Sequence, residues 1–322
     1  MKAAEYFRHD ELELARLMRQ LGVEAGVLRC PESADGTRTD EKTLRRLKQA
    51  FAGEGVSIQV IEPVPNDIHE PIKQGLPGRD AAIERLHDLI RTMGRLDIST
   101  LCYNFMARYG WTRNNTEYPA RGGARVSSFD RSQLPPEPAE PDLTEEQLWE
   151  NYRYFLRAVL PVAEEAGVTL ALHPDDPPVS PLRGVGRIFT SIAAFDRALA
   201  MSGSPFHAVT FCQGTFRLMG QPLPDLIRHF GMRIAYVHVR DTKGVPERFH
   251  ECFHDDGPTD MVEVFETYRK IGYDGYYRPD HVPTLEGESN ERPGYARLGR
   301  LFAVGYLRGI QTGIEQRPKH LP

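Results

Sequence analysis

The feature that most constrains the fold is an alternation of short apolar runs with amphipathic segments, repeated along the whole chain. Runs with the apolar and β-branched content of strands occur at 3–7, 24–30, 56–63, 97–105, 168–173, 208–213, 233–240 and 275–280. Segments with apolar residues at helical spacing occur at about 11–21, 40–53, 80–93, 144–167, 191–201, 222–230, 259–271 and 294–311. Eight strand–helix pairs close a parallel barrel, so the sequence predicts an α/β fold of the (β/α)8, or TIM barrel, type.

An open, doubly wound parallel sheet has the same alternation and stays an alternative on periodicity alone. No glycine-rich dinucleotide fingerprint follows an early strand, which removes the usual reason to prefer it. A length of 322 residues suggests two domains, but barrels often exceed ~150 residues as one, so we expect a single domain over 1–322. The polar, proline-rich region at about 106–143 is too long for a connector and predicts a lid or an oligomerisation arm.

The composition excludes several classes of function. The net charge of −5 offers no basic surface for nucleic acid or an anionic membrane. No apolar run approaches the ~20 residues of a membrane span, and the first residues lack the apolar core of a signal peptide. The four cysteines are widely spaced without a CxxC pair, which is typical of reduced thiols. We therefore expect a cytoplasmic enzyme or binding protein.

Polar residues whose burial costs free energy lie at the ends of four successive late strands, where barrel enzymes carry their active sites. One potential metal ligand from each strand end gives the set His173, Cys212, His238 and Asp280. Two imidazoles, a thiolate and a carboxylate suit a divalent transition ion such as manganese, iron, cobalt or zinc. Mixed ligands with a position open to substrate are typical of a catalytic site, whereas a closed tetrahedral site would be structural.

Each of these residues also has an ordinary structural explanation. A strand-end histidine is often only hydrogen-bonded, Cys212 has the surroundings of a small buried hydrophobe, and Asp280 would serve as a turn cap. The joint placement of four such residues favours the metal site over four separate coincidences.

A second cluster has the spacing of the HExxH zinc-protease motif, in His250, Glu251 and His254. That motif needs a helix, and the aspartates, glycine and proline that follow it predict a loop. We expect this loop to lie over the barrel mouth on the substrate side, and we expect Cys30 and Cys102 to be core residues.

Several segments, spread over nearly the whole chain, resemble the mannonate dehydratase family. The most specific are His-Pro-Asp-Asp-Pro-Pro at 173–178 and Arg-Pro-Asp-His at 278–281. Shorter matches are Cys-Tyr-Asn-Phe-Met at 102–106, Trp-Thr-Arg at 111–113, Phe-His-Glu at 249–251, Pro-Gly-Tyr at 293–295 and Gly-Arg at 299–300.

The resemblance implies a xylose-isomerase-like barrel that binds a divalent ion, with Mn²⁺ favoured over Fe²⁺, Co²⁺ or Zn²⁺. It implies conversion of D-mannonate to 2-keto-3-deoxy-D-gluconate and water. The family's ligands are similar to the four residues named above, and its catalytic pair to His281 and Tyr295. Which of the two is the base and which the acid stays open. We expect four further residues to bind the substrate: Asn104, Arg240, His250 and Arg300.

Arg240 is expected to grip the substrate carboxylate, and Asn104 and His250 to hold hydroxyl groups. If Tyr295 is the base, it needs a lowered pKa, which proximity to the metal ion or to Arg300 would provide. The only expected partners are a small sugar acid and further copies of the chain, in a dimer or a tetramer.

The chain departs from the family at the ends of its first two strands. Arg8 is followed by His-Asp-Glu instead of Trp-Tyr-Gly, and Arg-Cys-Pro-Glu-Ser at 29–33 replaces a His-His-Ile-Pro stretch. Ala107 also stands where proline is usual. Strand-end loops set specificity in barrels, so we expect weak or modest activity on D-mannonate. Three alternatives stay open: a dehydratase of another aldonic acid, a metal-dependent sugar isomerase or epimerase, and a catalytically silent binding barrel.

Overall fold

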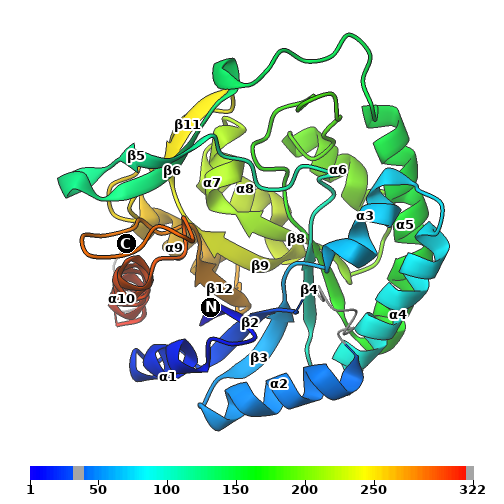
Figure 1. Cartoon of the computed structure of the whole chain (residues 1–322). Helices are drawn as coiled ribbons and strands as arrows, with labels where there is room; N and C mark the ends of the chain where they lie inside the picture. The colour runs from blue at the N-terminus through cyan, green and yellow to red at the C-terminus, as the bar shows by residue number, and fades with distance from the viewer. Residues whose placement is uncertain (32–39, 317–322) are drawn as a thin grey trace.

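A closed barrel of eight parallel strands forms the centre of the molecule in the computed structural model, which describes residues 1–31 and 40–316 (Figure 1). Around the barrel the strand order is β1-β12-β9-β8-β7-β4-β3-β2. The bounds are β1 Lys2–Arg8, β2 Ala25–Arg29, β3 Ser57–Ile61, β4 Thr100–Tyr103, β7 Thr169–Leu172, β8 His207–Cys212, β9 Ile234–Val239 and β12 Tyr276–Pro279. Every predicted strand is present, and the predicted barrel is confirmed.

Helices cover the outside of the barrel (Figure 1). They are α1 Leu12–Gln20, α2 Glu41–Gly53, α3 Asn66–Gln74, α4 Arg79–Arg95, α5 Glu145–Ala166, α6 Ile192–Leu199, α7 Gln213–Leu218, α8 Leu223–Phe230, α9 Met261–Lys270 and α10 Arg297–Glu315. The sequence predicted eight of these and missed α3, which contains Pro71, and α7, which is short and buried almost throughout. None of the helices in the described part of the chain is long and apolar enough to cross a membrane.

Local sequence explains why the elements form where they do. All six residues of β8 are buried, as expected for a parallel strand covered on both faces. The longest helix, α5, begins with the predicted capping box: the Thr144 hydroxyl accepts from the Gln147 backbone N–H, and the Gln147 side chain accepts from the Thr144 N–H. The helix ends at Gly167, whose φ of 67° is the left-handed conformation that glycine adopts readily.

The barrel interior is filled by a small apolar cluster, separate from the large core between strands and helices. Its buried members are Ala4, Tyr6, Ala25, Val27, Val60, Cys102, Ala171 and Tyr236. This packed floor closes the barrel, so a substrate can enter only at one end. Cys30 and Cys102 are both buried, which confirms the prediction that they are core residues.

A second, four-stranded antiparallel sheet lies beside the barrel, at the upper left of Figure 1. It contains β5 Asn115–Pro119 and β6 Arg125–Asp130, together with β10 Thr242–Val245 and β11 Arg248–Glu251, in the order β10-β11-β6-β5. The first two strands belong to the region 106–143. That region is therefore partly ordered as sheet, and it pairs with the segment that follows β9.

Candidate active site and metal centre

A polar cavity of about 240 Å³ opens at the carboxyl ends of the barrel strands. Its walls include both predicted catalytic residues and three of the four predicted metal ligands. The complete lining is Tyr6, Arg29, Glu62, Pro63, Asn66, Cys102, Tyr103, Asn104, Met106, Gly110, Trp111, His173, Asp176, His238, Arg278, Asp280, His281 and Tyr295. Chemically active side chains thus converge at the end of the barrel where the fold predicts an active site.

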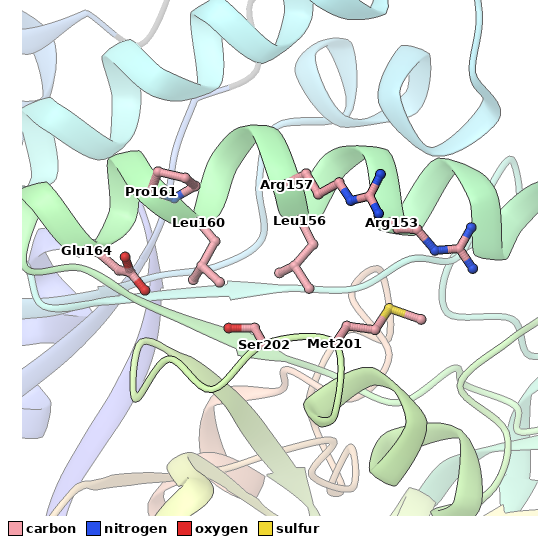
Figure 2. A pocket seen from close by; sticks show the side chains of 8 residues that line it. All are labelled: Arg153, Leu156, Arg157, Leu160, Pro161, Glu164, Met201 and Ser202. Atoms are coloured by element: carbon pink, nitrogen blue, oxygen red, sulfur yellow. The ribbon is translucent and has the colours of Figure 1, made fainter.

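A larger hollow of about 410 Å³ lies on the outer surface along α5. Figure 2 shows its walls: Leu156, Leu160 and Glu164 of α5 point toward Met201 and Ser202, which follow α6, and Arg153, Arg157 and Pro161 of the same helix complete the lining. None of the predicted ligands or catalytic residues contributes to this hollow. Size alone would favour the outer hollow, whereas the chemistry of the walls identifies the barrel mouth as the candidate site.

The four predicted metal ligands lie together. His173, Cys212 and His238 each offer a ligand atom within 4.8 Å of the others. Asp280 Oδ2 lies 3.6 Å from His238 Nδ1, which places the carboxylate next to this group. The strand ends of β7, β8, β9 and β12 therefore bring together two imidazoles, one thiol and one carboxylate.

The residues at this position fit a bound cation. His238 Nε2 contacts Glu62 Oε2 at 3.2 Å, while Nδ1 is buried and has no hydrogen-bond partner among the described residues. Burial would lower the pKa of His238, but the negative charges of Glu62 and Asp280 raise the pKa well above its usual value. The surroundings thus favour positive charge at the orphaned nitrogen, and a divalent ion would supply it.

The thiol of Cys212 is prepared for the same role. Burial would raise its pKa, but the charges of Arg240 and His173 outweigh burial and hold the pKa well below its ordinary range. Arg240 Nε lies 3.3 Å from the sulfur. Since the thiolate is the form that binds metal, Cys212 suits a soft ligand position.

His281 and Tyr295 both line the cavity and pack edge to face, with ring centroids 5.9 Å apart. The backbone N–H of Val282 donates to the Gly294 carbonyl at 2.9 Å, which ties together the two segments that carry them. His281 has a φ of 43°, a conformation that costs a non-glycine residue free energy and that marks functional sites. Burial, with the charge of Asp280, raises the pKa of Tyr295 well above its usual value, so its phenol stays protonated.

The four residues predicted to bind substrate have different placements. Asn104 lines the cavity. Arg240 does not: it is fully buried, and its guanidinium donates to Cys212, Glu251, Asp176 and Thr215. With its donors directed at protein atoms, Arg240 is not placed to grip a substrate carboxylate, which differs from the sequence-based expectation.

His250 and Arg300 also lie outside the cavity lining. His250 stacks on Tyr118 in the second sheet, with ring centroids 4.5 Å apart. Arg300 is buried and pairs with Glu5 at 3.0 Å, and its guanidinium carbon is 6.0 Å from the Tyr295 ring centroid. Burial and the charge of Asp280 raise the pKa of Tyr295, so at this distance Arg300 does not bring it below its usual value. The motif-like segment at 250–254 is not helical, as predicted, although its first two residues end strand β11 and are not in a loop.

Sequence reasoning missed the carboxylates and arginines that surround the site. Glu62 directly follows β3 and pairs with Arg278, whose Nη2 donates to Glu62 Oε1 at 2.9 Å. Asp176 and Glu251 share the guanidinium groups of Arg113 and Arg240. Glu62 could have been predicted as a site residue because it directly follows a barrel strand. Asp176 could have been predicted because it lies inside the His-Pro-Asp-Asp-Pro-Pro string.

Among the described residues of the segments that depart from the family, one side chain lines the cavity. Arg29 lines the cavity, whereas Arg8 and His9 do not. Glu32 and Ser33, which belong to the same departure, lie outside the described residues. The altered second strand end thus brings one guanidinium to the mouth, in a cavity that also contains Tyr6 and Trp111.

Comparison with known proteins connects this site to one family. The profile of the family described as D-mannonate dehydratase (UxuA) matches residues 1–141 and 138–320, nearly the whole chain. The chain belongs to the D-mannonate dehydratase family. It is 33% identical to mannonate dehydratase 2 of Halalkalibacterium halodurans over 336 residues, which cover 95% of this chain and 96% of that one. The mannonate dehydratase of Thermotoga maritima is 32% identical over 353 residues, covering 97% and 96%.

Solved structures agree with this assignment. The structure of mannonate dehydratase from Streptococcus suis matches with a TM-score of 0.87 and 30% identity, covering 99% of this chain and 96% of that one. D-Psicose 3-epimerase from Clostridium cellulolyticum matches with a TM-score of 0.62 at 14% identity, covering 98% of each chain, and supports the fold alone. The predicted family and the xylose-isomerase-like barrel are confirmed, and this member of the D-mannonate dehydratase family is an enzyme of the hydro-lyase type.

Proposed function

We propose that this protein removes water from D-mannonate to give 2-keto-3-deoxy-D-gluconate, with a divalent ion held by His173, Cys212, His238 and Asp280. The observation that carries the proposal is the convergence of these four groups with His281 and Tyr295 at one barrel mouth. Manganese is the ion that we favour, and iron, cobalt and zinc suit the same mixed ligand set. A homodimer or homotetramer stays a prediction.

The ion, when bound, would hold the substrate carboxylate and stabilise negative charge that develops beside it. The protein itself must then take the weakly acidic proton at C2 and protonate the hydroxyl that leaves C3. His281 and Tyr295 are the two cavity residues that we assign to these transfers. A protonated phenol suits the acid role, so we assign the leaving hydroxyl to Tyr295 and the C2 proton to His281.

The cavity walls separate binding from proton transfer. Asn104 lines the cavity and can bond a sugar hydroxyl, and Trp111 packs against His281, with ring centroids 5.0 Å apart. Trp111 and Met106 come from the region 106–143, which therefore contributes to the wall above the site. We propose that this part of the region shields the reacting groups from water, in line with its expected role as a lid.

The direct test is to incubate the purified, Mn²⁺-loaded protein with each hexonate and measure formation of a 2-keto-3-deoxy product. The proposal expects product from D-mannonate and none after removal of the metal by a chelator. Efficient turnover of D-mannonate would show that the changes at 8–11 and 29–33 are neutral. Absence of product from every hexonate would refute the proposed function.

A second candidate is the dehydration of another aldonic acid by the same groups. The observation that favours it is Arg29, a departure from the family that reaches the cavity. Because a site rejects analogues that leave its polar groups unpaired, one altered hydrogen-bonding group can redirect preference. A comparison of kcat/KM across the hexonates separates the two candidates.

A further inference from the structure

A buried cluster of charges lies directly behind His281. Asp176 and Glu251 each pair with both Arg113 and Arg240: Arg113 Nη1 is 2.7 Å from Asp176 Oδ1, and Arg240 Nη1 is 2.8 Å from Glu251 Oε1. All four side chains are nearly inaccessible to solvent. Two cations thus balance two carboxylates, which is the arrangement that buried charges need.

One of these carboxylates reaches the predicted catalytic histidine. His281 Nδ1 lies 3.1 Å from Glu251 Oε1. Burial would raise the pKa of Glu251, but the charges of Arg240 and Arg113 outweigh it and set the pKa at about 2. An ionised carboxylate can only accept hydrogen bonds, so the proton in this contact belongs to Nδ1 of His281.

The other ring nitrogen is directed toward the reacting groups. His281 Nε2 lies 3.5 Å from Asp280 Oδ1, on the side of the proposed metal ligands. In a neutral imidazole that carries its proton on Nδ1, Nε2 has a free lone pair and can take a proton. Trp111 packs against the ring, with centroids 5.0 Å apart.

We infer that Glu251 is a positioning residue, which accepts the Nδ1–H of His281 and so holds the ring with Nε2 turned toward Asp280 and the proposed metal ligands. Glu251 does not line the cavity, so it acts through His281 and has no contact of its own with substrate. Arg113 and Arg240 keep Glu251 an acceptor and hold it in position. This inference rests on the proposed function, in which His281 takes the C2 proton.

The first test reads the tautomer without using activity. Protein labelled with ¹⁵N-histidine and loaded with diamagnetic Zn²⁺ is examined by long-range ¹H–¹⁵N NMR, and the His281→Asn variant assigns the signals. We expect the proton of His281 on Nδ1 in the wild-type protein. A proton on Nε2 would overturn the inference, whether or not any variant folds.

The second test is a double-mutant cycle. Glu251→Met removes the acceptor at similar size and should lower kcat by about 10²–10⁴-fold, as expected when a base loses its orienting partner. KM and metal content should stay within about threefold if the loss is confined to proton transfer. In the His281→Asn background, Glu251→Met should have no further effect on kcat. An equal loss in both backgrounds would mean that Glu251 is merely structural, and would refute the inference.

Two further variants separate orientation from charge balance. Glu251→Gln keeps the shape of the side chain but replaces one acceptor oxygen by an NH₂ donor, so it should weaken the Nδ1–H tautomer and lower turnover, as amide replacement of an orienting carboxylate does. Asp176→Asn disturbs the same arginines through the other carboxylate and should leave the tautomer unchanged. Loss of the tautomer in Asp176→Asn, with retention in Glu251→Met, would contradict the assignment.

The outcomes for function and for positioning stay distinct. If no hexonate is dehydrated, the proposed function fails while the NMR result still decides the tautomer. If D-mannonate is turned over but His281 carries its proton on Nε2, the function stands and the positioning role of Glu251 is wrong.

Discussion

The carboxyl ends of the late barrel strands differ in chemistry from those of the early strands. Strands β7, β8, β9 and β12 bring His173, Cys212, His238 and Asp280 together, and His281 and Tyr295 follow β12. The early strands β1, β2 and β4 contribute Tyr6, Arg29 and Asn104, a phenol, a guanidinium and an amide that line the same cavity. One half of the barrel mouth thus carries the groups suited to bind metal and move protons, and the other carries groups suited to select a substrate.

This difference parallels the match to the family. The late half keeps the strings at 173–178 and 278–281, whereas the first two strand ends have the changed residues at 8–11 and 29–33, and only β4 in the early half keeps a matching string, at 102–106. The barrel allows such a separation because each strand end can change without moving the others. Glu62 is the exception, since it follows β3 and contacts His238 across the mouth.

The largest loss of turnover should come from removing a proposed metal ligand in the late half. Cys212→Ala and His238→Ala each remove a ligand from a buried site, so metal should be lost and turnover should fall to background. Elemental analysis of the purified variants measures this. Full metal occupancy in both would rule out the ligand set.

Removing the proposed general acid, Tyr295, should lower turnover without changing metal binding, and so distinguish the two roles of the late half. Tyr295→Phe keeps the ring but removes the proton that we assign to the leaving hydroxyl. We expect kcat to fall by about 10²–10⁴-fold with unchanged metal content. Steady-state kinetics on the preferred substrate decides, and normal turnover would transfer the role to another group.

Glu62 tests whether the early half also supports the metal. Glu62 accepts from one nitrogen of His238 and leaves the other for the ion, so Glu62→Gln should weaken Mn²⁺ affinity by about 10–100-fold. Calorimetric titration of the apo protein measures this, with Gln59→Ala on the same strand as a control. An unchanged affinity would mean that Glu62 does not orient His238 for the metal and serves only Arg278 and Tyr236.

The smallest effect should come from Arg29. Arg29→Ala leaves the metal ligands and proton donors in place, so metal content and kcat should change by less than about threefold, while KM and the preference among hexonates shift. Arg8→Ala, at the neighbouring strand end but outside the cavity lining, is the matched control. A large loss of kcat in Arg29→Ala would contradict the assignment of substrate selection to the early half and of chemistry to the late half.

Local pattern was sufficient for the barrel and for bringing the four proposed metal ligands to one end of it. Strands such as β8 are buried throughout, and their ends come together whatever the loops do, so periodicity and strand order together place His173, Cys212, His238 and Asp280. The second sheet escaped prediction because β5 and β6 are short, and β6 pairs with a strand more than 100 residues away. Alternation in so short a polar segment does not identify its partner.

The charge cluster escaped prediction for a similar reason. Arg240 follows the strand that carries His238, and its sequence position suggests a substrate contact. Its actual surroundings come from Asp176 and Asp280, which are distant in sequence, and from Glu251, which the β10–β11 hairpin brings back to Arg240. Glu251, inside a segment interpreted as a loop over the mouth, gains its place at the end of β11 from pairing with β6.

Arg113 limits how freely this barrel can be recombined with its relatives. It belongs to the 106–143 region, yet its buried guanidinium pairs with both Asp176 and Glu251. A chimera that exchanged this region for a segment without the arginine would leave those carboxylates short of a cation, at a cost of about 3–5 kcal/mol for each broken buried pair. The region and the barrel core therefore have to be exchanged together, and an engineer who shortens the region must design a replacement cation first.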